Sequence, residues 1–199
     1  MGTQFLAGWS AADISPVEPV LIAGQFHARV SEGVSDPVTA TVLAIEADTA
    51  DAVTRCLLIS CDLVGIPEHF RIEARKAICR HLPVLKPEEI VLNATHTHTA
   101  PEVRQAIDAA VTGGGNVPPV GNLGLPAMEP AEYISQVAEK IAVSACEAWE
   151  RREPSGIAFG LGQAVVGHNR RLSYLNGESV MYGDASLPTF CLLYTSRRG

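Results

Sequence analysis

The chain has 199 residues, with 15 Lys or Arg against 22 Asp or Glu, and its formal net charge is therefore −7. Its residues are 47% hydrophobic and 19% charged, which excludes an intrinsically disordered chain, because such chains contain few apolar residues. A net negative chain without a run of Lys and Arg lacks the basic face that phosphate contacts need, so no nucleic-acid partner is expected. No apolar run reaches the roughly 18 residues of a transmembrane segment.

The cysteine pattern argues against a disulfide-rich or zinc-ribbon protein. The five cysteines are an odd number and include no Cys-x-x-Cys pair, so we expect free thiols within apolar segments. Free thiols fit a reducing compartment, and the N-terminus has no signal-peptide pattern, so a cytoplasmic location is expected. The five are Cys56, Cys61, Cys79, Cys146 and Cys191.

The first half of the chain predicts a unit of strand, helix and strand. Residues 38–46 are β-branched and apolar, and residues 55–61 form a short apolar run, so both are predicted strands. Apolar residues at helical spacing after Pro67 predict a helix over 67–82. A further strand is predicted at 89–94. Strands joined through a helix normally run parallel, so we expect a right-handed βαβ crossover.

The middle of the chain predicts a long loop followed by a long helix. Residues 111–130 are rich in Gly and Pro, and loops of this length are commonly functional flaps, with a flexible excursion as the alternative. Apolar residues then recur at helical spacing over 130–152, which predicts an amphipathic helix. Together these patterns predict an α/β fold, with a mixed, partly parallel sheet and flanking helices.

Two further β elements are predicted near the C-terminus. Residues 155–167 are apolar and are predicted to form a strand. Residues 171–183 are predicted to form a hairpin, because Asn176-Gly177 suits a type I′ turn, in which both central residues have positive φ.

Two histidines follow the predicted strand 89–94. His96 and His98 are two residues apart, so their side chains would lie on the same side if the backbone stayed extended. Open α/β sheets bind ligands at the carboxyl ends of their strands, and Asp62 ends the neighbouring strand at the same edge. Imidazoles bind metals and titrate near neutral pH, so metal binding, proton transfer and a structural hydrogen bond are all open for this pair.

Four other polar residues are weaker candidates. Asp62 is either a polar group of the site or a turn former, and Asp13 is expected to turn the chain by accepting a backbone hydrogen bond. His27 follows a glycine-led loop and His168 lies in a predicted loop. For each of these histidines the alternative is an exposed position away from any site.

The segment from Thr95 to Pro101, Thr-His-Thr-His-Thr-Ala-Pro, resembles the Thr-His-Thr-His-Ser-Gly/Ala-Pro motif of neutral/alkaline, non-lysosomal ceramidases and their bacterial relatives. Three other stretches are similar in the same order, namely GWSAADISP, LLISCDLVGI and HNRRLSYLNG. The similarity extends over about residues 8–176, and the histidine motif is its most specific part.

This resemblance implies a zinc-dependent amidohydrolase that cleaves the amide between a fatty acid and a sphingoid base. By the resemblance, His96 is a zinc ligand, His98 assists proton transfer or holds a lipid-like amide substrate, and Arg170 lines the active site. We expect His96 and His98 to share one cleft and Arg170 to reach them from its separate segment. Zinc would activate water and polarise the amide carbonyl.

The chain also departs from the family pattern. Arg171 and Leu172 stand where the family has Ser-Pro, and Ser35 stands where relatives often have histidine. The family's other zinc ligands, a His, a Glu and a Tyr, find no match. Residues 1–190 are therefore expected to be the N-terminal portion of a catalytic domain, and 191–199, CLLYTSRRG, a non-native tail. We accordingly expect the 199-residue chain to be inactive and to bind zinc weakly.

Two alternatives from other classes remain. The chain could be a non-catalytic fragment that binds a ligand or a partner. It could also be a metal-independent hydrolase with His98 as general base, although no Gly-x-Ser-x-Gly motif accompanies the histidine.

Overall fold

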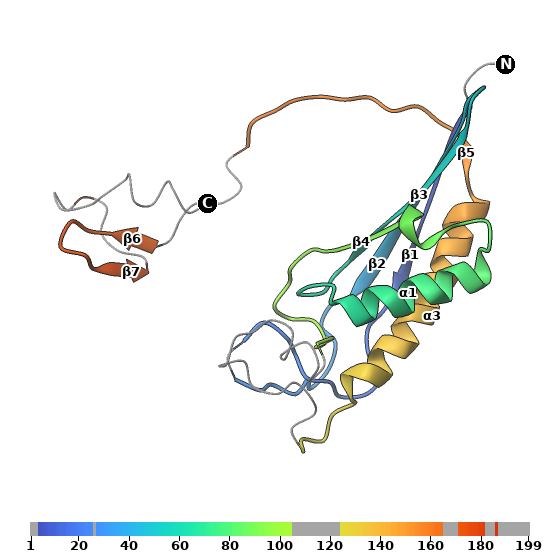
Figure 1. The fold of residues 1–199 in the computed structure, drawn as a ribbon. Coiled ribbons are helices and arrows are strands. Elements are labelled where there is room, and N and C mark those ends of the chain that lie inside the picture. Colours follow the sequence, from blue (N-terminus) through green and yellow to red (C-terminus); the bar gives the residue numbers. More distant parts are fainter. Residues whose placement is uncertain (1–3, 26, 105–123, 165–170, 182–185, 187–199) are drawn as a thin grey trace. The chain divides into compact units, whose positions relative to one another are not determined.

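A computed structural model describes residues 4–25, 27–104, 124–164, 171–181 and 186, which belong to two compact units that divide after Gly156. The first unit is a five-stranded sheet with the strand order β4-β3-β2-β1-β5, and two helices pack on one of its faces (Figure 1). Its elements are β1 (Gln4–Asp13), β2 (Thr39–Asp48), β3 (Val53–Cys61), α1 (Glu68–His81), η1 (Pro87–Glu89), β4 (Ile90–Ala94), α3 (Pro130–Glu150) and β5 (Glu153–Pro154).

The sheet is mixed, as predicted. β2 runs antiparallel to both β1 and β3, and β3 runs parallel to β4. The predicted unit of strand, helix and parallel strand is therefore confirmed as β3, α1 and β4. It follows that β1, β3 and β4 all point the same way, so their carboxyl ends lie along one edge of the sheet.

The hydrophobic core lies between the sheet and the two helices. Along β2, Ala40, Val42 and Ala44 are buried while Thr41 and Leu43 are exposed, so only one face of the sheet is covered. α3 presents an apolar stripe to that face, and each large side chain buried there contributes about 1.5–3 kcal/mol. The buried residues of α3 are Pro130, Tyr133, Ile134, Val137, Ala138, Ile141, Ala142, Ser144, Ala145 and Ala148. Within the described ranges, no helix is both long and apolar enough to cross a membrane.

Polar groups inside this core are hydrogen-bonded to each other. The Tyr133 hydroxyl donates to the Ile14 carbonyl oxygen at 2.8 Å, and burial raises the pKa of Tyr133 above its usual value. Ser144 donates to Ser10 at 3.0 Å, and Ser10 donates to a carboxylate oxygen of Glu147 at 3.0 Å. These bonds connect α3 to β1 and to Ile14, the residue that follows β1. They also satisfy polar groups that would destabilise the core if they were left unpaired.

The cysteines that the structure describes have free thiols, as expected from the sequence. Cys61 is buried at the end of β3, and burial raises the pKa of its thiol to about 12. Cys56, Cys79 and Cys146 are half-buried, whereas Cys191 lies outside the described residues.

Two strand predictions differ from the structure. β1 was not predicted, although it pairs with β2 along its whole length. Only Glu153–Pro154 forms a strand near the strand predicted at 155–167, and residues 155–164 have no regular structure. The side chains of Phe159 and Leu161 are fully exposed, so this segment lacks the packed face that a strand needs. Of the predicted loop at 111–130, residues 111–123 lie outside the described residues.

The second unit contains the predicted hairpin, with β6 (Arg171–Ser173) antiparallel to β7 (Ser179–Met181). Its turn is not type I′, because Gly177 has a positive φ of 87° and Asn176 does not. Gly177 N–H donates to Tyr174 O, and Tyr174 N–H donates to Glu178 O. This is a three-residue loop closed by a left-handed glycine, which is another common hairpin connection.

Candidate active site at the carboxyl edge of the sheet

The Asp62 carboxylate joins β2, β3 and β4 at the edge of the sheet where β1, β3 and β4 end. Its Oδ2 accepts hydrogen bonds from the Thr39 hydroxyl at 2.6 Å and from the Thr39 N–H at 3.2 Å. Its Oδ1 accepts one from the Thr95 hydroxyl at 3.1 Å. The hydrogen bonds from Thr39, and then that from Thr95, lower the pKa of Asp62. The sequence left two roles open for Asp62, a polar group of the site and a turn former. The structure gives it a third role, because its bonds join β2, β3 and β4 to one another.

His96 has a left-handed backbone conformation. Its φ is 66°, and among the described residues no other non-glycine residue has a positive φ. Such a conformation costs about 1–2 kcal/mol for a residue with a Cβ, so the surroundings must hold it. They do so with two hydrogen bonds to the segment after β3, because the His96 N–H donates to Leu63 O at 3.0 Å and ring Nδ1 lies 2.7 Å from Val64 O.

The contact with Val64 fixes the protonation of the neutral His96 ring. A carbonyl oxygen can only accept a hydrogen bond, so Nδ1 carries the proton and Nε2 keeps its lone pair. The side chain is exposed. Metal-binding histidines commonly donate one ring N–H to a carbonyl in this way, which orients the other nitrogen as a ligand. The chemistry that remains open to Nε2 of His96 is that of a lone pair, which can bind a metal ion or a proton.

The rings of His96 and His98 lie side by side. Their centroids are 5.1 Å apart and their planes meet at 74°, and both residues are exposed. The expected route to this arrangement was wrong, because β4 ends at Ala94 and the backbone turns at His96 instead of staying extended. The left-handed backbone at His96, and not the alternation of side chains along an extended strand, places the two rings together.

A second segment, residues 20–31, contacts His98 from the N-terminal part of the chain. Gly24 has a φ of 90°, and a Cβ built on it would lie 2.5 Å from Cγ of His98. Arg29 Nη2 donates to the His98 carbonyl oxygen at 2.7 Å. His27, which the sequence suggested from this loop, is exposed. Sequence reasoning missed Gly24 and Arg29, and the only signal was the glycine before the loop.

The residues after the histidine motif are held by a buried carboxylate. Glu102 is buried, and its Oε1 accepts the backbone N–H groups of Val103 at 3.0 Å and Arg104 at 2.8 Å. The Arg104 side chain also pairs with Glu102. From α1, His69 Nε2 lies 2.9 Å from Val103 O. The segment that follows the histidine motif is thus attached to α1, a connection that the sequence did not indicate.

The described residues alone do not complete a zinc site. Catalytic zinc usually has three protein ligands and one open position. Within residues 4–25, 27–104, 124–164, 171–181 and 186, no three His, Cys, Asp or Glu side chains lie close enough together to hold a metal ion. His96 Nε2 and the adjacent His98 ring are what this part of the chain offers. Arg170 and His168 lie outside the described residues.

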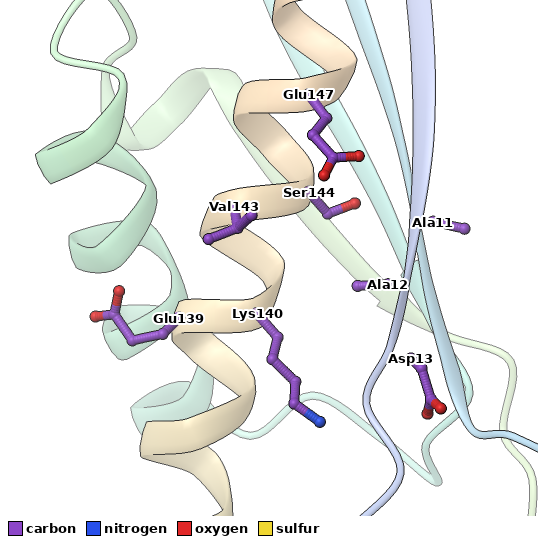
Figure 2. A pocket seen from close by; sticks show the side chains of 8 residues that line it. All are labelled: Ala11, Ala12, Asp13, Glu139, Lys140, Val143, Ser144 and Glu147. Carbon is purple, nitrogen blue, oxygen red and sulfur yellow. The ribbon is translucent and has the colours of Figure 1, made fainter.

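An open groove of about 400 Å³ lies elsewhere, between β1 and α3 (Figure 2). β1 and β4 are separated by two strands in the sheet, so this groove is not the histidine site. Its charged groups are engaged by the chain itself, because Asp13 accepts the Ser15 N–H at 2.8 Å and Lys140 donates to Ser15 O at 3.4 Å. The first contact confirms the predicted turn at Asp13. The lining residues are Ala11, Ala12, Asp13, Glu139, Lys140, Val143, Ser144 and Glu147.

The fold is an α/β sheet with helices on one face and a histidine pair at its carboxyl edge, and it is similar to part of known ceramidase structures. Over 87% of this chain, it aligns with a neutral ceramidase from Pseudomonas aeruginosa with a TM-score of 0.60 and 19% identity. A second structure, described as a ceramidase complexed with C2, aligns over 87% with a TM-score of 0.57 and 19% identity. This chain spans 24% and 23% of those two chains. No protein-family model and no curated protein matches the sequence.

Proposed function

We propose that this chain is part of a hydrolase of the neutral ceramidase type, which uses zinc to cleave an N-acyl amide. The observation that carries the proposal is the hydrogen bond from His96 Nδ1 to Val64 O, which leaves Nε2 as a ligand beside His98. The position of the pair after a parallel strand, and the similarity of the fold to two ceramidase structures, support it further.

Each residue of the proposed site has a separate task. His96 would hold zinc through Nε2, and the metal would supply a bound water of lowered pKa and a polarised amide carbonyl. His98, whose ring adjoins that of His96, would move a proton or hold the substrate. Arg170 would donate hydrogen bonds to the developing oxyanion. The remaining zinc ligands must come from outside the described residues, in this chain or in a longer one.

Zinc titration of the 199-residue chain tests the metal site. With an incomplete ligand set, we expect a dissociation constant weaker than micromolar, which corresponds to less than about 8 kcal/mol of binding free energy. Calorimetry should show this binding lost in His96→Ala and kept in His81→Ala. His81 is a suitable control because it is exposed on α1 and pairs with Glu139. Binding that survives His96→Ala would contradict the proposal.

The substrate class is tested by adding a soluble short-chain N-acylsphingosine to the zinc-loaded chain. We expect saturable shifts of the His98 ring resonances in NMR spectra, absent with the corresponding free sphingoid base. No turnover is expected from this chain. Amide hydrolysis that persists in His96→Ala would argue for a metal-independent base, and an unperturbed His98 ring would argue against an amide substrate.

The second candidate function is a ligand-binding fragment without catalysis, in which the exposed, adjacent rings of His96 and His98 contact the ligand and no metal takes part. If the amide shifts His98 equally well with and without zinc, this function is supported and the zinc mechanism is not.

A further inference from the structure

We propose that Arg29 is a positioning residue that fixes the His98 ring against the His96 ring. The inference rests on the proposed function of the histidine pair, and it concerns what holds that pair together. His96 and His98 are only two residues apart, yet they are attached to different parts of the fold.

His96 is held by the segment that follows β3. Its N–H and its ring Nδ1 bond to Leu63 O and Val64 O. Neither of these two hydrogen bonds involves residues 20–31. The place of His96 is therefore determined by the connection between β3 and α1.

His98 is held by the segment 20–31 instead. Arg29 Nη2 donates to His98 O at 2.7 Å and to Ala23 O at 3.1 Å, so one guanidinium joins the histidine to the strand-like segment beside it. That segment pairs with the end of the histidine motif, because Ala23 N–H donates to Ala100 O at 2.9 Å. Arginine suits this task because its planar guanidinium presents several donors in a fixed geometry.

Gly24 brings the backbone of the same segment against His98. A Cβ on Gly24 would lie 2.5 Å, 2.7 Å and 2.9 Å from Cγ, Cβ and Cα of His98. A glycine here removes the steric barrier, and the hydrogen bonds of Arg29 then set how close the two segments lie. The 5.1 Å separation between the rings of His96 and His98 therefore depends on how Arg29 and Gly24 contact His98.

Arg29→Met tests this role, with Arg55→Met as the matched control. Arg55 pairs with Glu46 at 3.0 Å on neighbouring strands, so its loss removes an arginine contact without touching the histidines. The measurement is the nuclear Overhauser effect between the two histidine rings, in the metal-free protein. We expect at least a twofold loss of this effect in Arg29→Met, no loss in Arg55→Met, and retention in Arg29→Lys, whose ammonium still donates.

A folded Arg29→Met protein with an unchanged ring-to-ring effect would overturn the proposal. If that variant does not fold, Arg29→Gln replaces it, because its shorter side chain does not span the distance to His98 O; the same loss is expected. The readout needs neither zinc nor substrate. If Arg29→Met loses the ring-to-ring effect and the wild-type chain binds no zinc, the positioning role is therefore supported and the proposed function is refuted.

Discussion

Gly8 of β1 lies directly against the backbone at the C-terminal end of α3, where a Cβ on Gly8 would be 2.4 Å from the carbonyl oxygen of Ala148. The same atom would be 2.7 Å from Arg152 N. These neighbours are backbone atoms, which cannot rotate away as a side chain can. The absence of a side chain at Gly8 therefore lets α3 approach the sheet.

Replacing this glycine with alanine should destabilise the first unit. We expect Gly8→Ala to lower the free energy of unfolding by about 1–3 kcal/mol, because the helix must shift. Gly33→Ala is the control, since a Cβ there would meet nothing within 4 Å, and it should change stability by less than about 0.5 kcal/mol. Urea denaturation followed by circular dichroism measures both, and similar midpoints for the two variants would contradict the close approach.

The left-handed conformation of His96 can be tested by comparing glycine with alanine at one position. Both substitutions remove the ring and its bond to Val64, but glycine adopts a φ of 66° without the Cβ penalty. We expect His96→Gly to be more stable than His96→Ala by about 0.5–1 kcal/mol in thermal unfolding. At His98, where φ is not positive, the order should reverse. The same order at both positions would rule out the strained backbone.

The Asp62 carboxylate should make stability depend on pH in the acid range. Its pKa in the folded state lies below the usual 3.8, mainly because Thr39 donates to it. A lowered pKa stabilises the fold above pH 3.8, and this stabilisation disappears as the pH falls through the folded-state value.

Asp62→Asn should therefore cost about 1 kcal/mol at pH 7, with a difference from wild type that shrinks below pH 4. Chemical denaturation at pH 3 to 7 provides the measurement. Asp51→Asn, in the exposed turn between β2 and β3, serves as the control and should show little difference at any pH. A constant difference between wild type and Asp62→Asn would show that the charge is not involved.

The buried hydroxyl of Tyr133 gives a prediction with two readouts. Tyr133→Phe removes the bond to Ile14 O and leaves that oxygen unpaired, which should cost about 1–2 kcal/mol. Because burial raises the pKa of Tyr133, the residue should stay protonated in the folded protein. Alkaline titration of the native protein at 295 nm should then give equal amplitudes for wild type and Tyr133→Phe, with a difference appearing only in urea. A smaller native amplitude for the variant would mean that Tyr133 is accessible.

Local patterns in the sequence were sufficient for the elements whose faces are clearly apolar. The helices α1 and α3 were predicted because burial on one face leaves a helical period in the residues, and the strands β2, β3 and β4 because their residues form short apolar or β-branched runs. β1 was missed because Gly8, Ser10 and Ala12, which line its inner face, are small or polar and give no such pattern. Their size becomes meaningful only once α3 lies against them.

The histidine pair shows the same division. The sequence by itself determined that two imidazoles follow a parallel strand, since that depends on their order along the chain. The tertiary structure decided that His96 is left-handed with Nε2 available, and that Arg29 and Gly24 contact His98. These contacts join residues as many as 74 positions apart, and no local propensity encodes them. They form because strand pairing brings distant segments to one edge, where unpaired carbonyls and N–H groups must find partners.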